Sequence, residues 1–127
     1  MPIPLLASGA FGIARFFAAN GVVNANLMAD AFRMSKPQLA QTIGLSVATL
    51  SKSDRQASPK AQARMTEMIE ILALVHDWAG GDAHAMAWYR SQPIPALDGR
   101  TAEALVKSGQ AAAVRDYLDH IALGGFA

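Results

Sequence analysis

The stretch from residue 58 to residue 81 constrains the fold most, because it carries every signal of one long helix. Ser58 can cap the helix with its hydroxyl, and Pro59 stands at the first helical position, where proline costs little. Gly80-Gly81 supplies the stop. Between these signals, apolar residues recur at helical spacing. The pattern predicts a helix over 58–79 whose inward side chains are Met65, Met68, Ile69, Leu72 and Val75.

Similar starts, stripes and stops divide the rest of the chain into shorter helices. No segment shows the period of two that a half-buried strand requires, so the sequence predicts an all-α protein. The predicted helices run from Ser8 to about Ala19 (stripe Phe11, Ala14, Phe17 and Ala18), from Asn24 (stripe Leu27, Met28, Ala31 and Phe32), from Ser35 to Ile43, over about 47–53 after a Ser46 cap, from an Asp82 cap to about Ser91, from Thr101 to Ser108, and from Gln110 to Leu123 (Val114, Tyr117, Leu118 and Ile121 inward). We expect Trp78 and Trp88 in the core, which leaves Tyr89 at the rim.

Charge is unevenly divided along the chain. Residues 1–60 carry a net charge of +4 and residues 61–127 a net charge of −3. A basic half is typical of a segment near a polyanion, although such a difference in charge also arises in small proteins without any functional meaning.

We expect a helical domain over 1–79 that dimerises and contacts DNA, and a small helical domain over 80–127, with the long helix joining the two. The apolar segment 1–23 is expected to bury against the same chain or against a second copy.

Composition and spacing exclude several classes of function. The chain has no cysteine, and therefore no disulfide framework and no thiol nucleophile. The three histidines, His76, His84 and His120, lack the spacing of a metal site, and we expect no metal, no cofactor and no enzymatic activity. No apolar run reaches the roughly 18 residues of a membrane span. Since no basic residue precedes Arg15 in the apolar start, we expect a cytoplasmic protein without a signal sequence.

Residues 36–54 have the pattern of a helix-turn-helix. Ala40 supplies the small side chain that lets two helices approach, and Gly44, four residues later, supplies the turn. Ser46 then caps the second helix. The apolar residues that fit the helix crossing are Leu39, Ile43, Leu45 and Leu50. The alternative interpretation is a helical pair kept as a scaffold or dimer interface, without DNA binding.

In a helix-turn-helix the second helix lies in the major groove with its N-terminal residues toward the bases. Here that set is small and polar, with few cations for phosphate contacts. No arginine is placed for a bidentate contact with guanine, so one copy should bind weakly and a dimer is needed. The candidate DNA-binding residues are Lys36, Gln38, Ser46, Ala48, Thr49, Ser51, Lys52 and Arg55.

The C-terminal part combines an aromatic pair, a proline-containing turn and a last helix flanked by glycines. Its segments are Ala87-Trp88-Tyr89, the run PIPALDGRTAEAL over 93–105, Ser108-Gly109, and Gly124-Gly125-Phe126-Ala127. Together with the helix-turn-helix pattern, these motifs resemble the MbcA/ParS/Xre antitoxin family from about Asn24 onward. Members of that family usually carry proline where this chain has Ala102.

The resemblance implies the antitoxin of a bacterial type II toxin–antitoxin system. The partners of such antitoxins are toxins with a RES domain, which has an ADP-ribosyltransferase-like fold and either degrades NAD+ or transfers ADP-ribose from it. The C-terminal region of the antitoxin covers the active site of the toxin, and the helix-turn-helix often binds operator DNA and autoregulates the operon. We expect a homodimer within a hetero-oligomeric complex. The alternative is a stand-alone Xre-like transcriptional regulator.

The C-terminal tail suits this implied role. After the Gly124-Gly125 break, Phe126 offers a flat apolar side chain that fits a nucleotide pocket. The Ala127 carboxylate can meet cationic groups that otherwise hold pyrophosphate. In the alternative, Phe126 packs back on the last helix at Val114 or Leu118. The candidate toxin-binding residues are Tyr89, Arg100, Arg115, Gly124, Gly125, Phe126 and Ala127.

Overall fold

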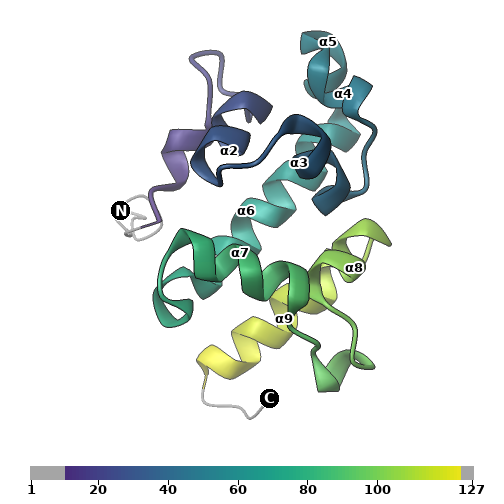
Figure 1. Cartoon of the computed structure of the whole chain (residues 1–127). Helices are drawn as coiled ribbons and strands as arrows, with labels where there is room; N and C mark the ends of the chain where they lie inside the picture. Colours follow the sequence, from purple (N-terminus) through teal and green to yellow (C-terminus); the bar gives the residue numbers. More distant parts are fainter. Residues whose placement is uncertain (1–10, 124–127) are drawn as a thin grey trace.

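Helix α6 (Pro59–Ala79) runs through the middle of the computed structural model, which describes residues 11–123 of the 127-residue chain. Before it come the 3-10 helix η1 (Ile13–Phe16) and the helices α2 (Ala25–Ala31), α3 (Lys36–Ile43), α4 (Val47–Ser51) and α5 (Ser53–Gln56); after it come α7 (Asp82–Ser91), the 3-10 helix η2 (Pro95–Leu97), α8 (Ala102–Lys107) and α9 (Ala111–Ala122). Figure 1 shows the elements before α6 gathered at one end of the molecule and α7 to α9 at the other.

The all-α prediction is confirmed for the part of the chain that the structure describes. Residues 11–123 form helices, turns and loops, and no strand. Extended pairing is limited there to two isolated antiparallel bridges, Phe17 with Val23 and Ile94 with Arg100. The second bridge closes a tight loop around η2, in which Asp98 has a φ of 63°.

Side-chain caps start most helices where the sequence predicts them. A side-chain oxygen accepts a hydrogen bond from the backbone N–H three residues later at Asn24, Ser46, Ser58 and Thr101. Ser35 forms a full capping box, because its own N–H also donates to the Gln38 side chain at 2.8 Å. Each of these bonds satisfies an N–H that has no partner within its helix, which contributes about 1 kcal/mol.

A cluster of buried apolar side chains extends along α6 and is shared by the elements at its two ends. The five predicted inward residues, Met65, Met68, Ile69, Leu72 and Val75, are at most 1% exposed, which confirms the prediction. Helix α6 contacts α3 and α5 as well as α7, α8 and α9. The basic and the acidic part of the chain therefore pack on the same helix.

The helix predicted over 8–19 is wrong in its described part. Only Ile13–Phe16 is helical, as a single 3-10 turn, and the predicted stripe residue Phe17 is exposed. Gly12, with a φ of 66°, interrupts the helix on one side, and the chain reverses direction over 18–21 on the other. Aromatic packing against the rest of the molecule overrides the helical spacing here. The predicted cap, Ser8, lies outside the described residues.

Arg15 organises the segment that replaces this helix. Its guanidinium carbon lies 4.6 Å from the ring centroid of Phe16, 4.9 Å from that of Phe11 and 5.9 Å from that of Phe32. It also donates two hydrogen bonds, of 2.8 and 2.9 Å, to the Asp82 carboxylate at the start of α7. The described part of the apolar N-terminal segment therefore packs on its own chain.

Asp82 does not cap α7, contrary to the prediction. The N-cap residue is Gly81, and Asp82 is the first helical residue. The hydrogen bonds from Arg15 lower the pKa of Asp82, burial opposes them, and the charges of Arg15 and His76 lower it further. Because Arg15 holds the carboxylate on the outside of the helix, the carboxylate makes no bond to the backbone of α7.

The helix predicted over 47–53 is divided into α4 and α5. The backbone is extended at Lys52, with φ −102° and ψ 125°. The buried side chain of Gln56 explains the division: it donates to the Leu50 carbonyl at 3.0 Å and accepts from the Ala25 N–H at 2.7 Å. These bonds require Gln56 to turn back toward α2, which one continuous helix does not allow.

Candidate functional site

Helices α3 and α4 meet at the turn that the sequence predicts for a helix-turn-helix. Gly44 ends α3 with a φ of 72°. Leu39, Ile43 and Leu50 are fully buried at the crossing, and Ala40 is 2% exposed. Helix α4 spans only five residues, however, little more than one turn. The assignment of this pair as a DNA-reading helix-turn-helix stays a prediction.

Side chains from α6 and α7 hold the end of α3. The Tyr89 hydroxyl donates to the Thr42 carbonyl at 2.8 Å, and Arg64 Nη1 donates to the Ile43 carbonyl at 2.8 Å. Carbonyls in the last turn of a helix lack a partner within it, so these donors satisfy groups that are otherwise orphaned. Burial raises the pKa of Tyr89, which keeps its hydroxyl protonated and able to donate.

Tyr89 is therefore unavailable to a toxin, contrary to the prediction. It is fully buried, whereas the adjacent Trp88, predicted to be core, is half-buried at the surface. Adjacent residues on a helix point about 100° apart, so only one of the two can face the core. The hydrogen bond to Thr42 explains why the tyrosine takes the inner position.

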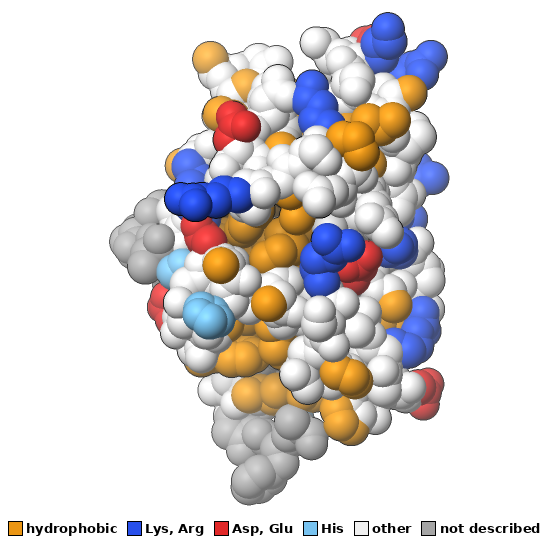
Figure 2. All heavy atoms as spheres, in the orientation of Figure 1, with side chains coloured by type: hydrophobic (Ala, Val, Ile, Leu, Met, Phe, Trp, Pro, Cys, Tyr) orange, Lys and Arg blue, Asp and Glu red, His pale blue; other side chains and the backbone are white. Residues whose placement is uncertain are grey.

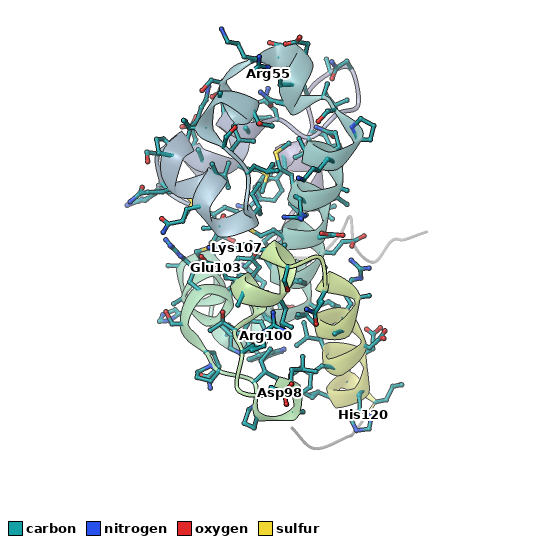
Figure 3. All side chains as sticks on the ribbon, turned by 90° about the vertical axis from the view of Figure 1, so that its right-hand side faces the viewer. Arg55, Asp98, Arg100, Glu103, Lys107 and His120 are labelled. Carbon is teal, nitrogen blue, oxygen red and sulfur yellow. The ribbon has the colours of Figure 1, made fainter. Side chains whose placement is uncertain are left out.

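A groove beside the α3–α4 turn gathers three of the predicted DNA-binding residues. It has a volume of about 360 Å³, and Ser46, Thr49 and Arg55 line it together with Lys60 from the first turn of α6. Hydroxyls and cations suit phosphate oxygens better than base edges. Figure 3 shows Arg55 at the end of the molecule opposite Asp98 and His120. We call this surface the basic groove.

The other predicted DNA-binding residues do not line the basic groove. Ala48, Ser51 and Lys52 are exposed on α4 or directly after it, and Lys36 and Gln38 lie in the first turn of α3. The Gln38 side chain already accepts the N–H of the α3 cap, so part of its hydrogen-bonding capacity serves the fold.

At the other end of the molecule, two tryptophans lie at the surface instead of in the core. Trp78 is 57% exposed, and its ring stands edge-on to that of Trp88, with the centroids 5.7 Å apart and the planes at 87°. The prediction that Trp78 is core is therefore wrong. The helical spacing contains a signal for this position. Trp78 follows Leu74 by four residues, so the two side chains share one face of α6, and both are exposed.

A groove of about 550 Å³ opens beside this pair, between α7, the loop to η2, and α9. No charged side chain lines it. Its lining residues are Trp78, Trp88, Gln92, Pro93, Ile94, Pro95, Tyr117 and Ile121. On the face drawn in Figure 2, hydrophobic side chains are exposed in the centre and in the lower half, and Lys and Arg side chains lie at the top end and also at mid-height and on the right-hand side. We call this surface the aromatic groove; none of its residues is among the binding residues predicted from the sequence.

The predicted toxin-binding arginines are both partly exposed, but only one of them is paired. Arg115 lies 3.0 Å from the Glu70 carboxylate on α6. Arg100 donates to the Ser108 hydroxyl at 2.9 Å, and no described carboxylate forms an ion pair with it. Arg100 is therefore the better placed of the two to meet an acidic group of a partner. The predicted tail residues, 124–127, lie outside the described residues.

Two further properties concern the part of the chain described by the structure. No group of histidine and carboxylate side chains there is arranged to hold a metal ion. No helix within the same residues combines the length and the apolar character that a membrane crossing needs.

One comparison with known proteins gives a match. Residues 73–124 match the family model described as the antitoxin Xre/MbcA/ParS C-terminal toxin-binding domain. No curated protein and no solved structure gives a significant match. The matched segment runs from the last part of α6 past the end of α9, and it contains every residue of the aromatic groove.

Proposed function

We propose, from the match of residues 73–124 to the toxin-binding domain family of the Xre/MbcA/ParS antitoxins, that the protein neutralises a RES-domain toxin of a type II toxin–antitoxin pair. In this proposal the chain is a binding protein that covers the active site of the toxin. The substrate of the toxin is NAD+, from which it either releases the nicotinamide or transfers ADP-ribose. The family match over residues 73–124 is the observation that carries the proposal.

The surface of the matched segment supports a role in protein binding. Exposed tryptophans are frequent anchors of protein interfaces, and the segment presents the exposed Trp78, beside the half-buried Trp88, at a charge-free groove. Arg100, without a described carboxylate partner, adds a cation on the same segment. The segment therefore combines an apolar centre with a charged neighbour, as many protein interfaces do.

For contact with the active site of the toxin we propose the tail, residues 124–127. In this proposal Phe126 stacks where a base or the nicotinamide lies, and the Ala127 carboxylate meets the cations that hold pyrophosphate. Leu123, the last described residue, is 88% exposed, so the described part of the chain ends at the surface of the molecule. That exposure supports the proposal.

Co-expression with the RES-domain protein encoded in the same operon tests the main proposal. We expect the two proteins to co-purify, and the full chain to suppress NAD+ consumption by the toxin. A variant that lacks residues 124–127 should still fold and bind but should fail to inhibit. Full inhibition by this variant would contradict the role of the tail. Absence of a complex and of any effect on NAD+ consumption would refute the antitoxin proposal itself.

We also propose that a homodimer of the chain binds operator DNA through the basic groove and α4. The cations Arg55 and Lys60 and the net charge of +4 over residues 1–60 support this proposal. In a mobility-shift assay with the promoter DNA, the double variant Lys52→Ala/Arg55→Ala should bind more weakly and depend less steeply on salt. Arg115→Ala, which removes a cation of the acidic half, is the matched control. DNA binding without any toxin partner would favour a stand-alone transcriptional regulator.

A further inference from the structure

The aromatic groove differs in its chemistry from the basic groove and from a further groove between α2 and α7. Charged side chains line the basic groove, and Arg33 and Asp82 line the groove between α2 and α7. The aromatic groove is lined mainly by apolar and aromatic side chains, and its polar groups, such as the Gln92 amide and the Tyr117 hydroxyl, are neutral. A surface of this kind favours an apolar group and offers no charge to a phosphate or a carboxylate.

The packing around this groove is incomplete in the isolated chain. Trp78 is 57% exposed, although burial of a large aromatic side chain is strongly favourable. Tyr117 and Ile121, which α9 directs toward the core, are only partly buried because they form one wall of the groove. No described residue bonds to the Tyr117 hydroxyl. An exposed tryptophan beside an uncharged, mainly apolar groove is a feature of many protein interaction sites.

We infer that the aromatic groove receives an apolar anchor side chain of the cognate toxin, held between Trp78, Trp88 and Ile121. The inference rests on the proposed function and adds a second contact to it. Every lining residue falls within 73–124, the toxin-binding family match, and the basic half of the chain supplies none. The occupant is a branched or aromatic side chain on the surface of the toxin. The polar backbone beside that side chain meets the Gln92 amide and the Tyr117 hydroxyl.

This contact is distinct from that of the tail. The tail is proposed to enter the active site of the toxin, whereas the aromatic groove takes a residue of the toxin into the antitoxin. In this scheme the tail is responsible for inhibition of the toxin, and the aromatic groove contributes to the affinity for the toxin. Loss of the tail should remove inhibition and leave much of the affinity, and loss of the groove should remove affinity.

The two tryptophans allow a direct test, because the chain has no others and both line the groove. The full chain is labelled with fluorotryptophan, and fluorine NMR spectra are recorded before and after addition of the unlabelled RES-domain toxin. We expect both resonances to shift when the complex forms. Unchanged resonances in a complex that forms by size-exclusion chromatography would overturn the inference and leave the antitoxin proposal intact.

Substitutions give a second, independent readout. Trp78→Ala and Trp88→Ala should each raise the Kd for the toxin by roughly 30-fold, the effect of a 2 kcal/mol interface anchor. Phe17→Ala is the matched control, because Phe17 is a 40% exposed aromatic residue far from the groove in the sequence, and it should leave the Kd unchanged. Unfolding curves show whether each variant keeps its fold. An unchanged Kd for folded tryptophan variants contradicts the inference.

Two other occupants predict different spectra without any toxin. If a second copy of the chain fills the groove, the resonances shift on dilution together with a change in oligomeric state. If residues 124–127 fill it, their deletion shifts the resonances of the free chain. If either result is found and the tryptophan variants keep the Kd for the toxin unchanged, the occupant of the groove is the second copy or the tail, and not the toxin. Failure of the toxin to form any complex refutes the proposed function first.

Discussion

Arg64 and Tyr89 show how single side chains tie the two halves of the molecule together. Each donates a hydrogen bond to one of the last two carbonyls of α3, and each comes from a helix of the central or C-terminal part of the chain. The Thr42 carbonyl that accepts from Tyr89 is buried, so loss of the Tyr89 hydroxyl leaves this carbonyl without a donor and destabilises the fold.

Replacing Tyr89 by phenylalanine is expected to lower the free energy of unfolding by about 1–3 kcal/mol, because the Thr42 carbonyl is left without a donor in a buried site. Urea unfolding followed by far-UV circular dichroism measures the change. Tyr117→Phe is the control, since no described residue bonds to the Tyr117 hydroxyl, and it should cost less than about 0.5 kcal/mol. Equal effects of the two variants would show that the hydrogen bond contributes nothing.

Asp82 makes stability depend on pH in the acid range. Hydrogen bonds from Arg15 place its pKa in the folded state below its ordinary value. A carboxylate with a lowered pKa stabilises the fold above its unfolded-state pKa of about 4, and this contribution is lost as the pH falls through the folded-state pKa. Asp82→Asn should therefore be less stable than the natural chain at pH 7, by up to about 1 kcal/mol for a partly exposed pair.

The difference in stability between the natural chain and Asp82→Asn should shrink below about pH 4, because the Asp82 carboxyl of the natural chain becomes protonated and loses its charge there. Thermal unfolding at a series of pH values measures it. Asp119→Asn, which removes an exposed carboxylate that forms no ion pair with any described residue, should show little difference at any pH. A difference between the natural chain and Asp82→Asn that stays constant down to pH 2 would contradict this account of Arg15.

At the scale of elements, the turn between α3 and α4 is constrained from two directions. Gly44 has a φ of 72°, which L side chains rarely adopt. A Cβ atom there would lie 3.0 Å from Arg64 Nη1 and 3.3 Å from the Lys107 Cα. Because Arg64 is itself bonded to the Ile43 carbonyl, it cannot move aside without losing that bond. The turn is thus packed against α6 and α8.

Gly44→Ala is expected to destabilise the protein by about 2–4 kcal/mol, because the strain of the left-handed backbone adds to the steric clash. Gly109→Ala is the matched control: its φ is 80°, but a Cβ atom there meets nothing within 4 Å. That variant should lose only about 1 kcal/mol, from backbone strain alone. Chemical unfolding of the two variants compares them, and equal losses would show that the contacts with α6 and α8 do not constrain the turn.

At the scale of the whole molecule, the basic and acidic parts share one helix and one cluster of buried side chains. Helix α6 packs against elements from both parts, and Arg15 is joined to Asp82 across 67 residues of sequence. Arg55 of the basic groove lies at one end of the described structure, and the candidate toxin contact Arg100 lies in the opposite half (Figure 3). The two functions proposed for the chain therefore use separate surfaces on a shared core.

A shared core predicts that the two parts unfold together. Tryptophan fluorescence reports only on the aromatic groove, since the two tryptophans of the chain are both there, whereas far-UV circular dichroism reports on all helices. The two signals should give coincident unfolding curves in urea, as a two-state transition requires. A fluorescence transition at a clearly lower urea concentration would show that the C-terminal part unfolds on its own.

Much of the secondary structure follows from local rules, and the failures have local causes too. The caps at Ser35, Ser46 and Ser58 act on N–H groups three residues away, so the sequence alone predicts them. The predicted helix over 8–19 is wrong because the position of its described residues depends on Arg15 and on the ring of Phe32, directly after α2. The division at Lys52 depends on a bond from Gln56 to another helix.

By itself, the sequence determined the all-α class, the long helix with its buried stripe, the glycine turn after α3 and the match of residues 73–124 to a family of antitoxin toxin-binding domains. These depend on capping, periodicity and motifs, which act within a few residues. The tertiary structure alone decided that Tyr89 is inside and Trp88 outside, that Trp78 faces solvent, and that an aromatic groove exists. The physical reason is distance along the chain: the Tyr89 hydroxyl finds its acceptor 47 residues away, and the groove is lined by side chains from α6, α7, the loop after α7 and α9.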